Sequence, residues 1–105
     1  MPRERGQALA VLVTFRVQAA HRAEFRDAVC ENARISLETE VGCQLFDVCE
    51  DPETKDFVLY EIYRDAAAFD HHLSSSHFHA FDRMVADWVE AKTVHRYTRL
   101  APAKS

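Results

Sequence analysis

Hydrophobic and polar residues alternate in several short stretches of the chain. In residues 8–17, ALAVLVTFRV, the odd-numbered positions are apolar and place one row of side chains on a single face: Val11, Val13, Phe15 and Val17. A period of two is typical of a half-buried β-strand. Apolar runs bounded by turn residues predict three further strands, at residues 44–50, 57–63 and 93–100. Residues 51–56, DPETKD, read as a turn, because Pro52 suits a corner and Asp51 can bond its own backbone.

The spacing of apolar residues changes to a helical period in two regions. Residues 21–40 place small or apolar side chains on one face, with charged residues opposite: Phe25, Ala28, Val29, Asn32, Ala33 and Ser36. Gly42 follows, as glycine often does where a helix ends. Asp65 can cap a short helix at 66–73, and the serines at 74–76 then break it and start a longer one. The longer helix has apolar residues at core spacing: Phe78, Phe81, Val85, Trp88 and Val89.

The elements follow one another in the order βαββαβ, with the second helical region split in two. This order predicts an α+β, ferredoxin-like domain, in which the helices cover one face of an antiparallel sheet. A chain of 105 residues is long enough for one such domain. We place it at residues 8–100 and expect short mobile tails at 1–7 and 101–105.

The third predicted strand is apolar on both of its faces. One face carries Phe57, Leu59 and Tyr63, and the opposite face carries Val58, Tyr60 and Ile62. A sheet with helices on one side usually has polar residues on the other, and this chain has no further element to cover the second face. We therefore predict a homodimer in which the sheets of two copies pack against each other.

Composition and charge exclude several classes of function. The formal net charge is −4, and no basic stripe exists that could neutralise the phosphates of a nucleic acid. No apolar run approaches the ~20 residues that span a bilayer, and the first residues do not follow the pattern of a signal peptide. The three cysteines, Cys30, Cys43 and Cys49, are odd in number and irregular in spacing, unlike a disulfide framework or a zinc motif. We expect a protein of the reducing cytoplasm.

Four of the six histidines lie in one stretch, FDHHLSSSHFHAFD at 69–82: His71, His72, His77 and His79. A metal site needs ligands that converge on one point. Adjacent histidines on a helix point about 100° apart, and histidines two residues apart diverge further. The chain also has no phosphate loop, GxGxxG, CxxC or HExxH motif. The sequence therefore predicts neither a metal nor another cofactor.

Several segments together resemble a known family. They are EFRDAVCEN, LFDVCEDPE, FVLYEIYRD, AFDHHLSSSHFHAF and RYTRL, and they extend from about Ala8 to Leu100. The most specific features are Tyr60-Glu61 on a strand and the pair His72 and His77, separated by small residues. In these features the chain resembles the antibiotic biosynthesis monooxygenase domain, above all its small bacterial members, the quinol monooxygenases and the isomerase of a phosphorylated autoinducer.

The resemblance implies a structure and a chemistry. The fold would be a ferredoxin-like dimer whose two sheets form a barrel, with a cavity between sheet and helices. The reaction would be the oxidation of a quinol-like or polyphenolic small molecule by O2, without flavin, haem or metal.

His77 is the candidate catalytic base. If Ser75 caps the longer helix, His77 lies in its first turn, where the positive end of the helix dipole favours a neutral ring that can take up a proton. Oxidation without a cofactor needs such a group, because the substrate must lose a hydroxyl proton before its anion can reduce O2. The alternative is a histidine that only bonds its neighbours. His72 matches a family position at the end of the short helix, where packing beside Phe69 is the other possible role.

Two further polar residues stand where apolar ones are expected. Asn32 falls on the buried face of the first helix, and a buried amide without a partner costs about 1–3 kcal/mol. Glu61 shares a face with apolar residues, so it either pairs with Arg16 or Arg96 or lines a cavity. Both match family positions that face the cavity, and with His72 they are the candidates that orient the substrate. Four aromatic residues are expected to contact the substrate, unless they only build the core: Tyr60, Tyr63, Phe81 and Trp88.

Three functions remain open from the sequence. The first is a cofactor-independent monooxygenase that uses His77 as base. The second is an isomerase of a small hydroxy-ketone, with or without a phosphate group. The sequence assigns no cationic residue to a pocket for such a phosphate. The third is a dimeric ligand-binding module without catalysis.

Overall fold

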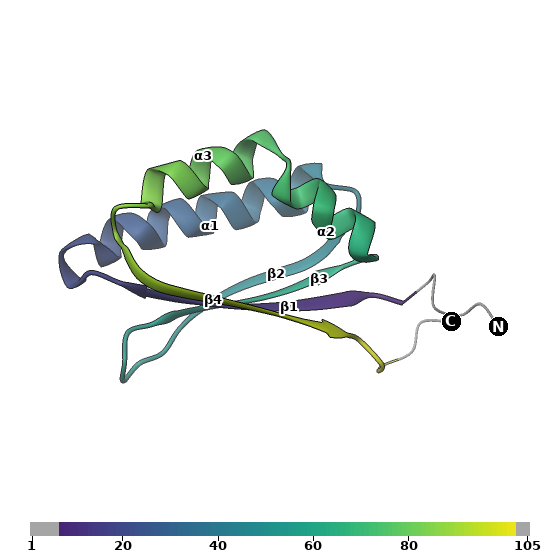
Figure 1. Cartoon of the computed structure of the whole chain (residues 1–105), viewed down its shortest axis with the longest axis horizontal. Helices are drawn as coiled ribbons and strands as arrows, with labels where there is room; N and C mark the ends of the chain where they lie inside the picture. The colour runs from purple at the N-terminus through teal and green to yellow at the C-terminus, as the bar shows by residue number, and fades with distance from the viewer. Residues whose placement is uncertain (1–6, 103–105) are drawn as a thin grey trace.

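The computed structural model describes residues 7–102, which form an antiparallel sheet with helices on one face (Figure 1). The strands are β1 (Leu9–Val17), β2 (Cys43–Glu50), β3 (Phe57–Tyr63) and β4 (Val89–Thr98), in the sheet order β2-β3-β1-β4. The helices are η2 (Ala19–His21, a 3-10 turn), α1 (Arg22–Thr39), α2 (Ala66–Leu73) and α3 (Ser76–Val85). The predicted α+β ferredoxin-like fold is confirmed. The predicted tails, 1–7 and 101–105, lie mostly outside the described residues.

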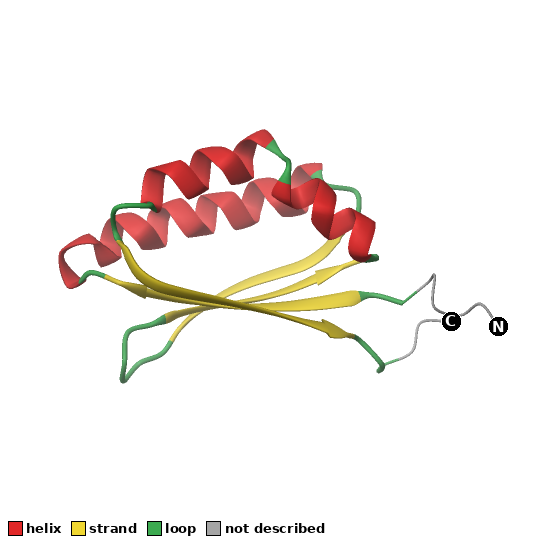
Figure 2. Cartoon of the chain, in the orientation of Figure 1, coloured by secondary structure: helices red, strands yellow, loops and turns green. Residues whose placement is uncertain are grey.

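The helices form one layer over the sheet, and the other face of the sheet has no covering element among the described residues (Figure 2). The core lies between the two layers. It joins the inward side chains of the sheet to the buried face of α1, with Phe25 in contact with the rings of Phe15 and Phe57. The outward face carries Tyr60 and Tyr97, which are 41% and 52% exposed. No helix in the described part of the chain has the length and apolar character needed to cross a membrane.

The end of α3 differs from the prediction. The helix stops at Val85, and Val89 already begins β4, opposite Val17 of β1. The predicted helical run through Trp88 and Val89 is therefore wrong, and β4 begins at residue 89 rather than 93. Two adjacent apolar residues satisfy a helical or a strand period equally well, and here the pairing with β1 decides. Trp88 lies in the connecting turn and stacks on the ring of His21 at 5.3 Å.

The predicted helix caps are present and set the positions of the histidines. The Asp65 carboxylate accepts a hydrogen bond from the backbone N–H of Ala68 at 2.9 Å, which starts α2. The Ser75 hydroxyl accepts one from the N–H of Phe78 at 3.2 Å, which starts α3. His72 thereby falls in the last turn of α2, and His77 in the first turn of α3.

Gly42 allows α2 to approach the start of β2. A Cβ atom at this position would lie 2.4 Å from the Cβ of Ala68, so no larger residue fits without a shift of the helix. This close approach brings the end of α1, just before Gly42, beside the end of α2.

Candidate active site

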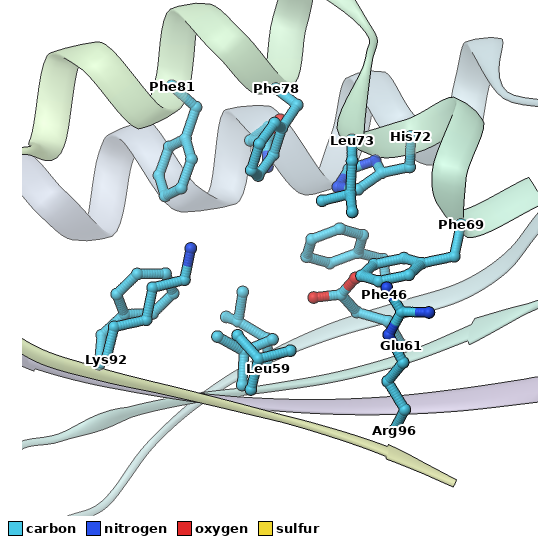
Figure 3. A pocket seen from close by; sticks show the side chains of 14 residues that line it. Phe46, Leu59, Glu61, Phe69, His72, Leu73, Phe78, Phe81, Lys92 and Arg96 are labelled. Atoms are coloured by element: carbon cyan, nitrogen blue, oxygen red, sulfur yellow. The ribbon is translucent and has the colours of Figure 1, made fainter. Parts of the chain in front are cut away.

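A cavity of about 150 Å³ lies between the sheet and the helices (Figure 3). Its wall is mostly apolar, with a few polar side chains that converge on it: Asn32, Glu61, His72, Lys92 and Arg96. The apolar wall comes from every layer of the fold: Val13, Phe15, Phe46, Leu59, Phe69, Leu73, Phe78, Phe81 and Val94. A largely apolar cavity with a few polar groups is typical of a small-molecule site.

Three helix ends bring together a carboxylate and two histidines behind this cavity. The carboxylate oxygen Oε2 of Glu40, the residue after α1, lies 2.7 Å from Nδ1 of His72 and 2.5 Å from Nε2 of His77. The hydroxyl of Ser36 lies 3.5 Å from the same His72 nitrogen. Glu40 and His72 are buried, whereas 15% of the His77 side chain is exposed. The three side chains form a chain of hydrogen bonds from the cavity toward the surface.

His72 has one nitrogen engaged and one available. Its Nδ1 faces Glu40, and within residues 7–102 no side chain or backbone group bonds Nε2. Burial lowers the pKa of His72, and the hydrogen bond and charge of Glu40 oppose this effect without outweighing it. The ring is therefore neutral at neutral pH. Donation of the Nδ1 proton to Glu40 leaves Nε2 as an acceptor at the cavity wall.

Glu61 and Tyr63 form a second polar pair on β3. The phenol of Tyr63 donates a hydrogen bond to Oε1 of Glu61 at 2.6 Å. Burial raises the pKa of Glu61 to about 7, and the hydrogen bond from Tyr63 limits the rise. Burial also raises the pKa of Tyr63, so the phenol keeps its proton. Glu61 can thus present either a carboxyl or a carboxylate to a ligand near neutral pH.

Asn32 has an amide oxygen without a partner. The Oδ1 atom is buried and accepts no hydrogen bond from the described residues. The residue lines the main cavity and also a second hollow beside His77 and Phe81. Since a buried acceptor without a partner costs about 1–3 kcal/mol, this position is suited to accept a hydrogen bond from a bound molecule.

Two cationic side chains of β4 lie over aromatic rings that line the cavity. The ammonium of Lys92 lies 5.4 Å from the ring centre of Phe15 and 5.8 Å from that of Phe78. The guanidinium of Arg96 lies 4.8 Å from the ring centre of Phe69. Both are cation–π distances. Neither cation lies within salt-bridge distance of a carboxylate in the described part of the chain.

The structure brings together most of the residues singled out from the sequence. Asn32, Glu61, His72 and Phe81 line the cavity. Tyr63 does not line the cavity, but its phenol donates a hydrogen bond to the Glu61 carboxylate. His77, the candidate base, lies behind His72 and does not line the main cavity.

Two of the predicted substrate-binding residues lie elsewhere. Tyr60 points to the outward face of the sheet, because it alternates with the inward Glu61 along β3. Trp88 stacks on His21 near the start of β4 and does not line the cavity. Of the two possibilities for Glu61, the structure has the cavity lining: Arg16 pairs with Asp56 at 3.6 Å, and within residues 7–102 no arginine lies within salt-bridge distance of Glu61.

Glu40 was missed in the sequence. It follows Glu38 and Thr39 in a polar stretch at the end of α1, and only its burial distinguishes it from exposed neighbours. One signal was available: a glutamate just before Gly42 lies where the chain turns into the sheet.

Glu40, His72 and His77 could also hold a divalent metal, since their ligand atoms all lie within 4.8 Å of one another. Zinc bonds to nitrogen and oxygen are about 2.0–2.2 Å long, so ligands on one ion sit more than about 3 Å apart. The distances of 2.7 and 2.5 Å from Glu40 to the two rings are those of hydrogen bonds. The arrangement fits a carboxylate that accepts from two imidazoles.

Comparison with known proteins agrees with this fold and shows the family of the chain. The model of the antibiotic biosynthesis monooxygenase family matches residues 8–84. A Nitrosomonas europaea protein proposed to be an antibiotic biosynthesis monooxygenase superposes with a TM-score of 0.88; it is 27% identical, over 94% of this chain and 96% of that one. Rv0793 from Mycobacterium tuberculosis gives a TM-score of 0.84 at 24% identity, over 92% and 99% of the two chains, and supports the fold alone. Comparison with curated proteins finds no match. The chain belongs to the antibiotic biosynthesis monooxygenase family.

Proposed function

We propose that this chain is a monooxygenase that oxidises a quinol-like or polyphenolic small molecule with O2 and needs no cofactor. The observation that supports this most is the buried, neutral His72, which is held by Glu40 and lines a largely apolar cavity. An engineered apolar cavity of similar volume holds a benzene-sized ring, so an aromatic ring is a reasonable occupant.

His72 is the proposed base, in place of His77. Nε2 takes the proton of a substrate hydroxyl, and the Nδ1 proton stays hydrogen-bonded to Glu40. The carboxylate then stabilises the imidazolium that forms, as the buried acid does in other acid–histidine pairs. His77 lies on the other side of Glu40 and is partly exposed, which gives the proton a path to solvent.

The remaining polar groups hold the substrate. Asn32 can accept a hydrogen bond at Oδ1, and Glu61 can bond a second hydroxyl while Tyr63 fixes its orientation. Lys92 and Arg96 add positive charge around the substrate anion. Cations that are already in position when the anion forms stabilise its negative charge.

Once deprotonated, the substrate can itself supply the two electrons that would otherwise come from an external reductant. The anion transfers one electron to O2, and the two radicals combine through a new carbon–oxygen bond to give a peroxide. Cleavage of the O–O bond leaves one oxygen on the ring, and the other departs as water. For a quinol the balance is quinol plus O2 to hydroxyquinone plus water, so no external reductant is required.

We also propose that the protein is a homodimer and that it acts in the cytoplasm. The outward face of the sheet, with exposed Tyr60 and Tyr97, is suited to pack against the sheet of a second copy. Cys30, Cys43 and Cys49 are all unpaired, which is consistent with a protein of the cytoplasm.

The test is oxygen uptake with a naphthoquinol, corrected for its spontaneous oxidation. His72→Ala should lower kcat by about 10²–10⁴-fold, the usual effect of losing a general base. His79→Ala is the matched control, because His79 lies on the exposed side of α3, and it should change kcat by less than about twofold. The wild-type rate should persist in EDTA. Equal effects of the two substitutions, or a rate abolished by EDTA and restored by a divalent metal, would contradict the proposal.

An isomerase of a small hydroxy-ketone is the second candidate. Such an enzyme acting on a phosphorylated substrate needs cations at the pocket, and Lys92 and Arg96 line it. His72 would then move a proton between neighbouring carbons with Glu61 as partner. Conversion of a hydroxy-ketone under nitrogen, with no oxygen uptake from any quinol, would favour this function over the first.

A further inference from the structure

The two cations of the cavity stand at different ends of it. Lys92 and Arg96 are four residues apart on β4, opposite Phe15 and Val11 of β1, so about 13 Å of strand separates their backbones. Figure 3 shows Arg96 on the same side as Phe69, Glu61 and His72, and Lys92 on the opposite side. The two side chains therefore lie toward different ends of the cavity, although the pKa of Glu61, which burial raises, is still lowered to a smaller extent by the charge of Lys92.

The end near His72 has the groups for a hydroxyl. The proposed base, the Glu61 carboxyl and the guanidinium of Arg96 all lie there. The other end has Lys92, whose ammonium is held over Phe15 and Phe78 without a carboxylate partner among the described residues. An ammonium that faces a ligand cavity and has no carboxylate within hydrogen-bonding distance is suited to bind an anion.

The charges of the cavity agree with this assignment. Lys92 and Arg96 contribute two positive charges, and the acidic residue among the lining side chains is Glu61. The cavity wall therefore carries a net positive charge whether or not Glu61 is ionised, although the whole chain has a net charge of −4. An anionic substrate complements this charge better than a neutral quinol does.

We propose that the substrate is an elongated aromatic acid, with its reactive hydroxyl at His72 and an anionic substituent, such as a carboxylate, bound by Lys92 at the opposite end. This assignment rests on the proposed function for the role of the hydroxyl end. It narrows the substrate class from quinol-like compounds in general to those with an acidic group remote from the oxidised ring position. Val94 forms the floor between the two cations and is 46% exposed, so a longer ring system can extend along β4.

The test is a binding titration that involves no turnover. The probes are a fluorescent hydroxynaphthoate, with hydroxyl and carboxylate at opposite ends of the ring system, and the matching neutral hydroxynaphthamide. The wild-type protein should bind the acid about tenfold more tightly than the amide, the usual scale for one charge-assisted hydrogen bond. Lys92→Met should abolish this difference and leave amide binding unchanged. Lys92→Arg, which keeps the charge, should preserve most of it.

Arg83→Met is the matched control, because it removes one positive charge from the exposed side of α3 and should leave the preference intact. Added salt should weaken binding of the acid and not of the amide in the wild type, a readout that needs no variant. Equal affinity for the two probes, a preference that survives Lys92→Met, or no binding of either probe at millimolar concentration would overturn the proposal. If the acid binds as expected but no quinol consumes oxygen, the substrate class stands and the proposed function fails. If neutral quinols are oxidised and the acid does not bind, the reverse holds.

Discussion

Glu40→Gln isolates the role of the carboxylate that lies between the two histidines. Its Oε2 atom bonds both rings, and neither carboxylate oxygen reaches the cavity. Glutamine keeps the size of the side chain and one carbonyl oxygen but removes the charge. When His72 takes a proton from the substrate, the wild-type protein has an opposite charge 2.7 Å from Nδ1, and the variant has a neutral amide.

The expected loss of rate follows from that charge. Two unit charges about 4 Å apart attract by about 4 kcal/mol at the effective dielectric constant of a protein site. Because this attraction develops only as the proton moves, it acts on the transition state, and its loss lowers kcat by about 10³-fold. KM should change little, since Glu40 does not line the cavity.

The pH profile provides a second readout. Glu40 raises the pKa of His72 by its hydrogen bond and charge, against the larger effect of burial. Removal of the charge should therefore lower this pKa further and move the acid limb of the oxygen-uptake profile to lower pH. A carboxylate that only supported the fold would leave the limb in place.

Glu38→Gln is the control, because Glu38 is exposed on the same helix and pairs with Arg34. Its kcat should stay within about twofold of the wild type. Thermal unfolding of both variants separates lost activity from lost structure. A kcat for Glu40→Gln within a few-fold of the wild type, with an unchanged acid limb, would refute the proposed role of Glu40.

Two more predictions concern stability and assembly. Burial raises the pKa of Glu61 from 4.5 to about 7, so the folded protein binds the Glu61 proton more tightly than the unfolded chain does. The contribution of this proton to the free energy of unfolding is full below pH 4.5 and is lost as the pH rises through about 7. The loss amounts to up to about 3 kcal/mol. In urea unfolding, Glu61→Gln should flatten this part of the pH dependence of stability. His72 makes the opposite contribution, which is lost as the pH falls below the ordinary histidine pKa, but this contribution is common to both proteins. Identical pH dependences of the two proteins would show that Glu61 titrates normally. In light scattering at micromolar concentration, the wild type should have twice the chain mass of 12.1 kDa, and Tyr60→Glu on the outward face should shift it toward the monomer. A wild-type monomer would refute the sheet-to-sheet dimer.

The fold could be predicted from the sequence because the local patterns and the long-range strand pairing favour the same elements. The alternation in β1 and β3 and the caps at Asp65 and Ser75 all act within a few residues of chain. The exception was the start of β4, where Trp88 and Val89 satisfy both periods and only the pairing with β1 decides.

The site could be predicted only in part, because its chemistry depends on contacts between elements that are distant in the sequence. Asn32 and Glu61 were found because a polar residue on an apolar face is visible in the pattern. Glu40 was not found, because nothing in its local pattern distinguishes it from the exposed Glu38. Lys92 could not be assigned to the cavity, since its inward direction depends on its register opposite Phe15.

The placement of charge around the cavity connects the proposed base to the proposed substrate. The helices supply a base that burial keeps neutral, and the sheet supplies the two cations, Lys92 and Arg96. Before proton transfer, Lys92 pairs with the remote anionic group of the proposed substrate, and the neutral hydroxyl lies at the Arg96 end of the cavity. After transfer, the new oxyanion faces Arg96, and the imidazolium of His72 faces Glu40. Each charge created by the transfer thus meets an opposite charge already in place, so the arrangement stabilises the anion, the form that can give an electron to O2.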